Sequence, residues 1–510
     1  MKKLSFINYQ PSTIIYPLSL IFYLLSAFIC LAQPQQAWVV RYNGGFTNKT
    51  HTPLAMKLDV AGNIYVAGSS QNASNFYDYV VLKYAPNGTL QWAARYSPTN
   101  GGTYPANGFA LDQSGNTYMT GGIVEQGFGQ YPKTYVIGNG ATVKFDTSGK
   151  LAWAAPYTGN DVAVDTNGNV YVTGFSTTEY ATAKLDASGN NLWTRTYVGV
   201  AGSGNPVSVS QKVAVDNAGN VYVAGWADYL GYIFAGQMEY YSEAVILMYN
   251  GTGAVLWTNT PYFVGQSWEQ IAGLIPDNQD NIYVTANGEL GGTARVKING
   301  PIEWNQHAGP SAGVSGIAID SGGNAYLTGG PYVTFRLIST NGEVAWYVNP
   351  SSGTANGIAL DQSVNVYVTG FTNSGVASND WETVKYDING NQQWVIIYNG
   401  PANGNDGATA IAVAPDGSIY VTGYSQNTSG GSDITTIKYG NITNLQKKSD
   451  GSIQLQFFGN PGQSYNFQAT TDFLSWINLG SSLADTNGVF YFLDTNAPLF
   501  PYRFYRYSPP

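Results

Sequence analysis

The amino-acid sequence predicts an all-β fold, and three features lead to that prediction. A ten-residue pattern recurs eight times along the chain, and runs of aromatic and β-branched residues surround every copy. The composition agrees, because 61 Gly and 39 Tyr occur among 510 residues. Gly supplies tight turns, Tyr is enriched in strands, and no helical period competes with the repeat.

The charge content restricts the classes of partner. Charged residues make up only 10% of the chain, whereas 44% is hydrophobic, so apolar material for a large core is available. The formal net charge is −9 and the sequence contains no basic run. We therefore expect no nucleic-acid partner, because such proteins present clustered Lys and Arg.

The first 32 residues form a predicted secretory signal peptide. Lys2 and Lys3 precede an apolar stretch, residues 14–32, that ends in small residues. An uncleaved anchor is the alternative, and Ile29 before the single cysteine, Cys30, argues against lipidation. Cleavage after Ala32 leaves a secreted or cell-surface protein without a membrane span, disulfide, thiolate metal site or Cys nucleophile.

The repeated pattern is Asp-x-x-Gly-Asn-x-Tyr-Val-x-Gly, and successive copies begin 41 to 61 residues apart. An apolar run precedes most copies, and a third run follows, then a Gly with a Trp four residues later, as in Gly390 and Trp394. Four strands per unit indicate a β-propeller of eight four-stranded blades, with seven blades as the alternative. The copies begin at Asp59, Asp112, Asp165, Asp216, Asp277, Asp320, Asp361 and Ala414.

The last unit lacks its fourth strand, because no Gly and Trp follow residues 434–439 in the expected register. The first strand of the mature chain, residues 38–42, matches residues 92–96 and therefore supplies it. Such a closure removes an open sheet edge. We assign residues 33–440 to the propeller.

The patterns D-x-x-G-N-x-Y-V-T-G and T-V-K-Y-D-x-x-G-x-x-x-W resemble the bacterial β-propeller repeat family known as SBBP. The resemblance covers residues 38–439 and implies a secreted or surface-exposed propeller, but it brings no catalytic residues. This sequence departs from the pattern at Asp280 and Val364, which replace Gly, and at Ala286, which replaces the last Gly of its unit.

Residues 441–510 form a separate C-terminal module. Runs such as 452–458, 465–470 and 489–493 alternate and are separated by turn residues, which predicts a small β-sandwich. Its sequence resembles C-terminal modules of large secreted bacterial proteins, and that resemblance assigns no role.

Most polar residues of the repeat have a structural interpretation. The Asp-x-x-Gly-Asn copies are predicted to be tight turns and not calcium loops, because they lack a distal bidentate Glu. We expect no metal and no cofactor. Four acids at one repeated position are interpreted as structural or solvated charges on one rim, with paired acid/base carboxylates as the alternative, and five repeated lysines are interpreted as packed blade residues: Asp78, Glu179, Asp380, Asp433, Lys83, Lys144, Lys184, Lys385 and Lys438. The only histidines, His51 and His307, form no motif.

Nonrepeated residues are better candidates for function, since the scaffold does not require them. The long connections, residues 122–140 and 226–243, are rich in aromatic residues, which stack on sugars. Mutual covering of the loops is the alternative. The candidate ligand-binding residues are Trp226, Tyr229, Tyr232, Phe234, Tyr240, Tyr241, Phe128 and Tyr131.

These observations favour a noncatalytic, monomeric binding or scaffolding propeller with a carbohydrate or protein ligand. The alternative is a polysaccharide-active hydrolase or lyase with two carboxylates among Glu125, Asp228, Glu239 and Glu243. A quinoprotein-like dehydrogenase fits poorly, because a mature chain without cysteine cannot form the adjacent-cysteine disulfide typical of those enzymes. The fold alone decides among none of these.

Overall fold

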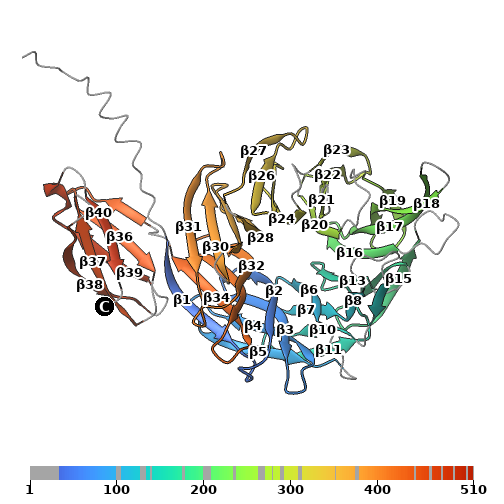
Figure 1. Cartoon of the computed structure of the whole chain (residues 1–510), viewed down its shortest axis with the longest axis horizontal. Coiled ribbons are helices and arrows are strands. Elements are labelled where there is room, and N and C mark those ends of the chain that lie inside the picture. Colours follow the sequence, from blue (N-terminus) through green and yellow to red (C-terminus); the bar gives the residue numbers. More distant parts are fainter. Residues whose placement is uncertain are drawn as a thin grey trace, which may run out of the picture.

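The computed structural model describes residues 34–98, 105–126, 134–137, 140–174, 179–198, 208–233, 237–261, 270–277, 279–287, 292–307, 313–350, 352–373, 378–440, 444–458, 462–471, 475–485, 489–500 and 503–508. Within these ranges, eight four-stranded antiparallel sheets surround one axis as the blades of a propeller (Figure 1). The predicted fold class is therefore confirmed, with eight blades and not seven. The signal-peptide prediction lies outside the described residues.

Each blade runs outward from an inner strand at the axis. The inner strands are β2 (His51–Leu58), β6 (Ala106–Leu111), β12 (Asp161–Val164), β16 (Ser208–Val215), β20 (Gln270–Pro276), β24 (Gly313–Ile319), β28 (Gly353–Leu360) and β32 (Asp406–Val413). The second strands are β3 (Ile64–Gln71), β7 (Thr117–Gly121), β13 (Val170–Thr173), β17 (Val221–Ile233), β21 (Asn281–Asn287), β25 (Ala325–Gly330), β29 (Val366–Asn373) and β33 (Ile419–Gln426).

The third strands are β4 (Tyr77–Tyr84), β10 (Thr142–Phe145), β14 (Tyr180–Leu185), β18 (Gln237–Tyr249), β22 (Gly292–Lys297), β26 (Val333–Leu337), β30 (Asn379–Tyr386) and β34 (Ser432–Gly440). The outer strands are β5 (Leu90–Tyr96), β11 (Leu151–Ala155), β15 (Asn191–Tyr197), β19 (Val255–Asn259), β23 (Ile302–His307), β27 (Val344–Val348), β31 (Gln392–Tyr398) and, for the last blade, β1 (Gln35–Tyr42). Blade 2 also carries a separate ribbon of β8 (Ile123–Gln126) and β9 (Thr134–Ile137).

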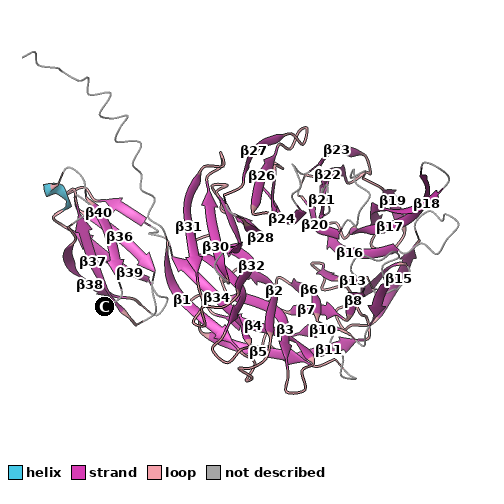
Figure 2. Ribbon diagram, in the orientation of Figure 1, coloured by secondary structure: helices cyan, strands magenta, loops and turns pink. Residues whose placement is uncertain are grey.

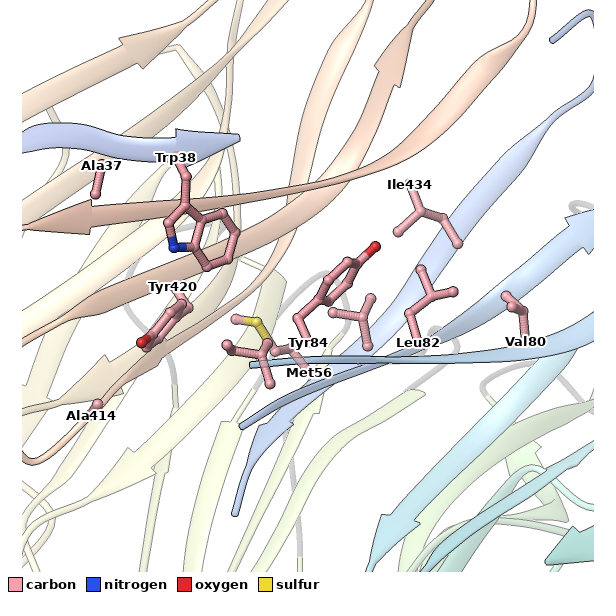
Figure 3. Packing of buried hydrophobic residues seen from close by; sticks show 11 residues of the cluster. Ala37, Trp38, Met56, Val80, Leu82, Tyr84, Ala414, Tyr420 and Ile434 are labelled. Atoms are coloured by element: carbon pink, nitrogen blue, oxygen red, sulfur yellow. The ribbon is translucent and has the colours of Figure 1, made fainter. Parts of the chain in front are cut away.

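The N-terminal strand closes the ring as predicted. β1 pairs antiparallel with β34, so strands far apart in the sequence complete blade 8. Figure 3 shows the seam between blades 8 and 1, where the rings of Trp38 and Tyr420 lie 5.9 Å apart beside Met56 and Tyr84. The guanidinium of Arg41 adds an ion pair of 2.9 Å with Asp433.

Each Asp-x-x-Gly-Asn copy forms a hairpin turn, which confirms that interpretation. In blade 2, Asp112 Oδ1 accepts the N–H groups of Ser114 and Asn116, both at 2.9 Å. Its Oδ2 accepts the amide of Asn116 at 2.8 Å and the hydroxyl of Tyr118 at 3.0 Å. The carboxylate thus satisfies the turn backbone and the buried Tyr together, so the residue types of the repeat follow from hydrogen bonding.

Outer-strand tryptophans connect neighbouring blades. The indole of Trp92 in blade 1 donates to the Thr147 carbonyl in blade 2 at 3.1 Å. Its ring covers Gly149, whose φ is +82° and where a Cβ would lie 2.7 Å from Trp92 Cδ2. Only Gly combines the left-handed conformation with this approach. The same indole-to-carbonyl bond links Trp38, Trp153, Trp193, Trp257, Trp304 and Trp346 to the next blade.

The repeated basic residues have the packed role that the sequence predicts. Lys83 lies over the ring of Tyr65 at 5.0 Å from the centroid, and Lys385 lies over Tyr367 at 5.0 Å. Lys184 Nζ also donates to the Gly251 carbonyl at 3.2 Å. Cation–π contacts and carbonyl acceptors therefore account for these charges.

The C-terminal residues form two three-stranded sheets. One contains β35 (Asn444–Lys447), β36 (Ile453–Phe458) and β39 (Val489–Asp494), and the other contains β38 (Ile477–Leu483), β37 (Ser464–Thr470) and β40 (Phe504–Ser508). Their facing rings, Phe467 and Phe490 among them, form one core. The short 3₁₀ helix η1 (Ala497–Leu499) interrupts a structure otherwise made of strands (Figure 2). No helix among the described residues is long and apolar enough to cross a bilayer.

Candidate functional site

The repeated acids at the start of the third strands are mainly buried structural groups. Asp78 is 5% exposed and accepts from Arg95 at 2.8 Å and from Asn72 and Ser97. Asp433 repeats this arrangement with Arg41 and Asn427 in blade 8. Asp78 and Asp433 are therefore structural groups and not solvated ones, because each is buried and forms an ion pair with a guanidinium from the outer strand of its own blade.

The other two acids at this repeated position differ. Burial raises the pKa of Asp380, and the charge of Asp406 adds to that effect. Asp406 is fully buried and accepts the N–H groups of Gly400 at 2.6 Å and Gln426 at 3.0 Å. Glu179 lies one residue before β14. These contacts bring no two of the four repeated acids together.

The two histidines lie in different blades, His51 in blade 1 and His307 in blade 5. His51 is fully buried at the start of β2, where Nδ1 lies 2.8 Å from Ser70 Oγ and Nε2 lies 3.0 Å from the Phe46 carbonyl. Burial lowers the pKa of His51. The hydrogen bonds pin the connection between β1 and β2, which is a structural role. His307 ends β23, and its side chain lies outside the described residues.

The predicted long connection of blade 4 is a regular ribbon and not a loop. β17 and β18 pair over thirteen positions, from Val221 with Tyr249 to Ile233 with Gln237. The inner strand pairs with β17 only as far as Ala227. The outer strand pairs with β18 only as far as Ile246. The six pairs beyond Ala227 therefore extend past the four-stranded sheet. In blade 1, by comparison, only one pair, Gln71 with Tyr77, extends past the strand that pairs with β3 on its inner side.

The structure places the candidate aromatic residues at different levels of this ribbon. Trp226 is 2% exposed, at the base, where it pairs with Ala244. Tyr229 pairs with Tyr241, Leu230 with Tyr240, and Tyr232 with Met238 in the free part of the ribbon. The side chains of Tyr229, Tyr232, Tyr240 and Tyr241 lie outside the described residues, as do Phe234, Phe128 and Tyr131 entirely.

The structure describes the side chain of one of the four carboxylates named for the alternative, enzymatic hypothesis. Glu243 pairs with Ala227 at the base of the ribbon, and burial raises the pKa of its side chain. Asp228 and Glu239 are ribbon positions and Glu125 lies in β8, but their side chains are outside the described part of the chain. A general acid requires such a raised pKa, and a glycosidase requires a second carboxylate nearby.

A pocket of about 510 Å³ opens at the other end of the same blade, between the turns of blades 4 and 5. Asp216, Asp277, Asp280, Asn217 and Asn281 are among the residues that line it. The hydroxyl of Tyr222 donates to Asp216 at 2.7 Å, and burial raises the pKa of this Tyr. The volume falls within the range of ligand pockets, and the wall is rich in acceptors.

The pocket lies where the sequence departs from the repeat. Asp280 occupies the left-handed Gly position with φ 61°, and its carbonyl accepts the Ile298 N–H at 2.9 Å. A Cβ on Gly300 would lie 3.6 Å from Trp257, whereas the equivalent approach of Trp92 to Gly149 is 2.7 Å. The blade 4 to blade 5 seam is thus more open than its equivalents. Sequence reasoning noticed Asp280 but predicted no pocket there.

Comparisons with known proteins agree on the fold. The SBBP β-propeller repeat model matches residues 155–179. The C-terminal WD40 domain of Sif2 shares 10% identity and a TM-score of 0.51, over 80% of this chain and 98% of that one. BamB from Moraxella catarrhalis shares 13% identity and a TM-score of 0.48, over 80% of this chain and 100% of that chain.

The quinohemoprotein alcohol dehydrogenase of Comamonas testosteroni shares 12% identity and a TM-score of 0.47, over 79% of this chain and 76% of that chain. No curated protein matches by sequence. At these identities the likeness to the WD40 domain supports the propeller fold and nothing finer.

Proposed function

The chain is a β-propeller that carries the SBBP repeat, and from that premise we propose that it is an exported, noncatalytic binding or scaffolding protein. It acts as a monomer and presents the blade 4 ribbon, residues 228–242, to a carbohydrate or protein ligand. One observation carries the proposal: this ribbon continues for six residue pairs beyond the sheet that supports it.

The ribbon costs conformational entropy that the propeller core does not require. A free two-stranded ribbon is marginally stable in water, so a chain that keeps one has a use for it. Six residues of strand extend the blade by about 20 Å. The sequence of this segment contains four Tyr residues, whose rings offer rigid, amphipathic contact area to sugars and to protein surfaces.

Export is supported by the position of the closing strand. β1 begins at Gln35, so cleavage after Ala32 would leave all of β1 available to complete blade 8. N-terminal sequencing of protein recovered outside the cytoplasm tests this part. A first residue of Gln33 is expected, and a start within residues 36–42 would contradict it because the closing strand would be truncated.

The binding proposal is tested with a ribbon-truncated variant. Replacing residues 228–242 by Asn-Gly joins Ala227 to Glu243 through a two-residue hairpin turn and leaves the paired sheet of blade 4 complete. Wild-type protein and this variant are screened on a glycan array. A photo-crosslinking residue at position 232 is used in parallel to capture protein ligands.

The matched control is Tyr347→Ala, which removes an aromatic side chain that is 66% exposed on the outer strand of blade 6. Glycan binding that survives in Tyr347→Ala and disappears on truncation supports the ribbon as the ligand surface. Glycan binding that persists after truncation refutes it. A screen with no glycan bound and no crosslink from position 232 refutes the ribbon for both ligand classes.

A polysaccharide-active enzyme is the second candidate, and the raised pKa of Glu243 is the observation that favours it. Incubation with a panel of polysaccharides, followed by reducing-end analysis, tests this candidate. Release of oligosaccharides by the wild type and its loss in Glu243→Gln would establish turnover. Equal release by both proteins would remove Glu243 from the reaction.

A further inference from the structure

A basic residue of the third strand lies over the repeated Tyr of the second strand in seven of the eight blades, 5.0 to 5.7 Å from the centroid of the ring. The seven residues are Lys83, Lys144, Lys184, Arg295, Arg336, Lys385 and Lys438. In blade 4 the residue that pairs with the repeated Tyr222 is Met248. Blade 4 alone therefore has no charge at this position.

The other blades show where the ammonium group lies. In blade 3, Lys184 Nζ donates at 3.2 Å to the Gly251 carbonyl of the next blade, which also accepts the indole of Trp193 at 3.3 Å. The same sharing of one carbonyl by a lysine and a tryptophan recurs in blades 2 and 8. In blade 4 the indole of Trp257 donates to the Ile298 carbonyl at 2.7 Å. Ile298 is therefore the equivalent acceptor.

The pocket of about 510 Å³ between blades 4 and 5 includes the two residues that flank the ammonium in this arrangement. Tyr222 and Ile298 are both among its lining residues. Met248 packs in one cluster with Tyr222, and its side chain is uncharged and one heavy atom shorter than that of lysine. Blade 4 thus has the carbonyl acceptor of the repeat at a pocket and lacks the ammonium that the repeat places on it.

The charge of this pocket is negative. Asp216, Asp277 and Asp280 line it, and none of its described lining residues is basic. The ammonium of the neighbouring Lys297 already forms an ion pair of 3.0 Å with Glu303. Asp280 is exposed, and its carboxylate accepts no hydrogen bond from the described residues. Three carboxylates without a cation among them attract a positively charged ligand.

An organic ammonium group suits this wall better than a metal ion does. The Asp216 carboxylate already accepts two backbone N–H groups, the Asn220 amide and the Tyr222 hydroxyl. Calcium needs six or more oxygen ligands, and among the described residues no three acidic, His or Cys side chains are arranged to hold a metal ion. An ammonium group has only three donors, and the Ile298 carbonyl and the Asp280 carboxylate supply two acceptors.

We propose that the pocket between blades 4 and 5 binds a small aliphatic diamine, one ammonium group of which takes the place that the lysine Nζ has in the other blades. The Ile298 carbonyl accepts a hydrogen bond from this ammonium, and Asp280 is its counter-ion. The pocket is larger than one ammonium group requires, and Asp277 offers a charge to the second. The site is at the opposite end of blade 4 from the ribbon and does not rest on the proposed function.

Isothermal titration calorimetry of the purified protein with 1,4-diaminobutane and, separately, with butylamine tests the site. One saturable site is expected, and the diamine should bind at least about threefold more tightly because it carries a second charge. Met248→Lys supplies the ammonium of the repeat itself, so it should weaken diamine binding by at least about tenfold. The matched control is Met248→Leu, which is uncharged and similar in volume and should retain affinity within about threefold.

Asp280→Asn tests the carboxylate without changing the shape of the turn, because Asn tolerates the left-handed φ of 61°. Affinity for the diamine should fall by at least about fivefold with the loss of this charge. Wild-type affinity in folded Met248→Lys or in Asp280→Asn would overturn the proposal, as would the absence of a saturable site for the diamine. Displacement of the diamine by an equal concentration of calcium chloride would overturn it too, because the wall would then be a metal site.

Discussion

Two glycines with the same backbone angle allow the energy of tryptophan docking to be measured. Gly149 and Gly219 both have φ +82° and both donate their N–H to the Asp that opens the turn. A Cβ on Gly149 would lie 2.7 Å from Trp92, whereas a Cβ on Gly219 would meet nothing within 4 Å. Substitution by Ala should therefore cost more at position 149.

The magnitudes follow from separate physical causes. Ala in the left-handed region costs about 1–2 kcal/mol at either position. At Gly149 the added methyl also displaces the indole, which costs about 1–3 kcal/mol for overpacking. Displacement lengthens the 3.1 Å bond from Trp92 to the Thr147 carbonyl, worth about 1 kcal/mol. We expect a loss of about 3–6 kcal/mol for Gly149→Ala and about 1–2 kcal/mol for Gly219→Ala.

Urea unfolding monitored by circular dichroism measures both variants. A double-mutant cycle completes the test, because Gly149→Ala in a Trp92→Ala background should cost only the backbone strain. Equal losses for Gly149→Ala and Gly219→Ala would refute the docking argument. An unchanged cost in the Trp92→Ala background would do the same.

Three further predictions concern stability. Burial lowers the pKa of His51 below the value near 6.5 of an unfolded chain, so the unfolded state binds more protons in mild acid. The free energy of unfolding should therefore fall as the pH drops below about 6.5. In His51→Gln it should fall less over the same pH range, as urea titrations at several pH values would measure. Val364 has φ 60°, so Val364→Gly should raise the free energy of unfolding by about 1 kcal/mol. Arg41→Met leaves Asp433 without its ion-pair partner. The free energy of unfolding should therefore fall by about 2–3 kcal/mol, which thermal unfolding detects as a lower melting temperature.

Each of these three predictions has a result that would contradict it. A parallel pH response of the wild type and His51→Gln would show that other groups dominate acid destabilisation. A loss of stability in Val364→Gly would mean that side-chain packing at this turn outweighs the relief of backbone strain. For Arg41→Met, the added change Asp433→Asn should recover part of the loss, since it removes the unpaired charge. No recovery would assign the loss to packing of the Arg stem.

The repeat explains why so much of the fold could be predicted. Most units contain the Asp of the turn, the Asn and Tyr that bond to it, and the Trp that docks on the next Gly, as Asp112, Tyr118 and Trp153 illustrate. These interactions span few residues or one blade, so they appear as fixed spacings in the sequence. The closing strand could be predicted for the same reason, because residues 38–42 repeat the wording of other outer strands.

The candidate functional sites were less predictable because they depend on segments and contacts that do not recur in every unit of the repeat. The aromatic content of residues 226–243 marked blade 4, but only the register shows a paired ribbon and a buried Trp226 at its base. The burial of Asp78 and Asp433 followed from guanidinium groups that arrive from other strands. Sequence spacing carries no information on such partners.

The sequence by itself determined the four-stranded blade, the chemistry of its turns and the strand that closes the ring, because periodic short-range interactions encode them; the structure decided for eight blades and against seven. Only the tertiary structure decided that the seam of blades 4 and 5 is open. It also decided that the carboxylate of Asp161 accepts the Val213 N–H of the next inner strand. The physical reason is that ring closure brings inner strands of different blades around one axis. A side chain on one blade then meets a backbone group that the linear sequence places 52 residues away.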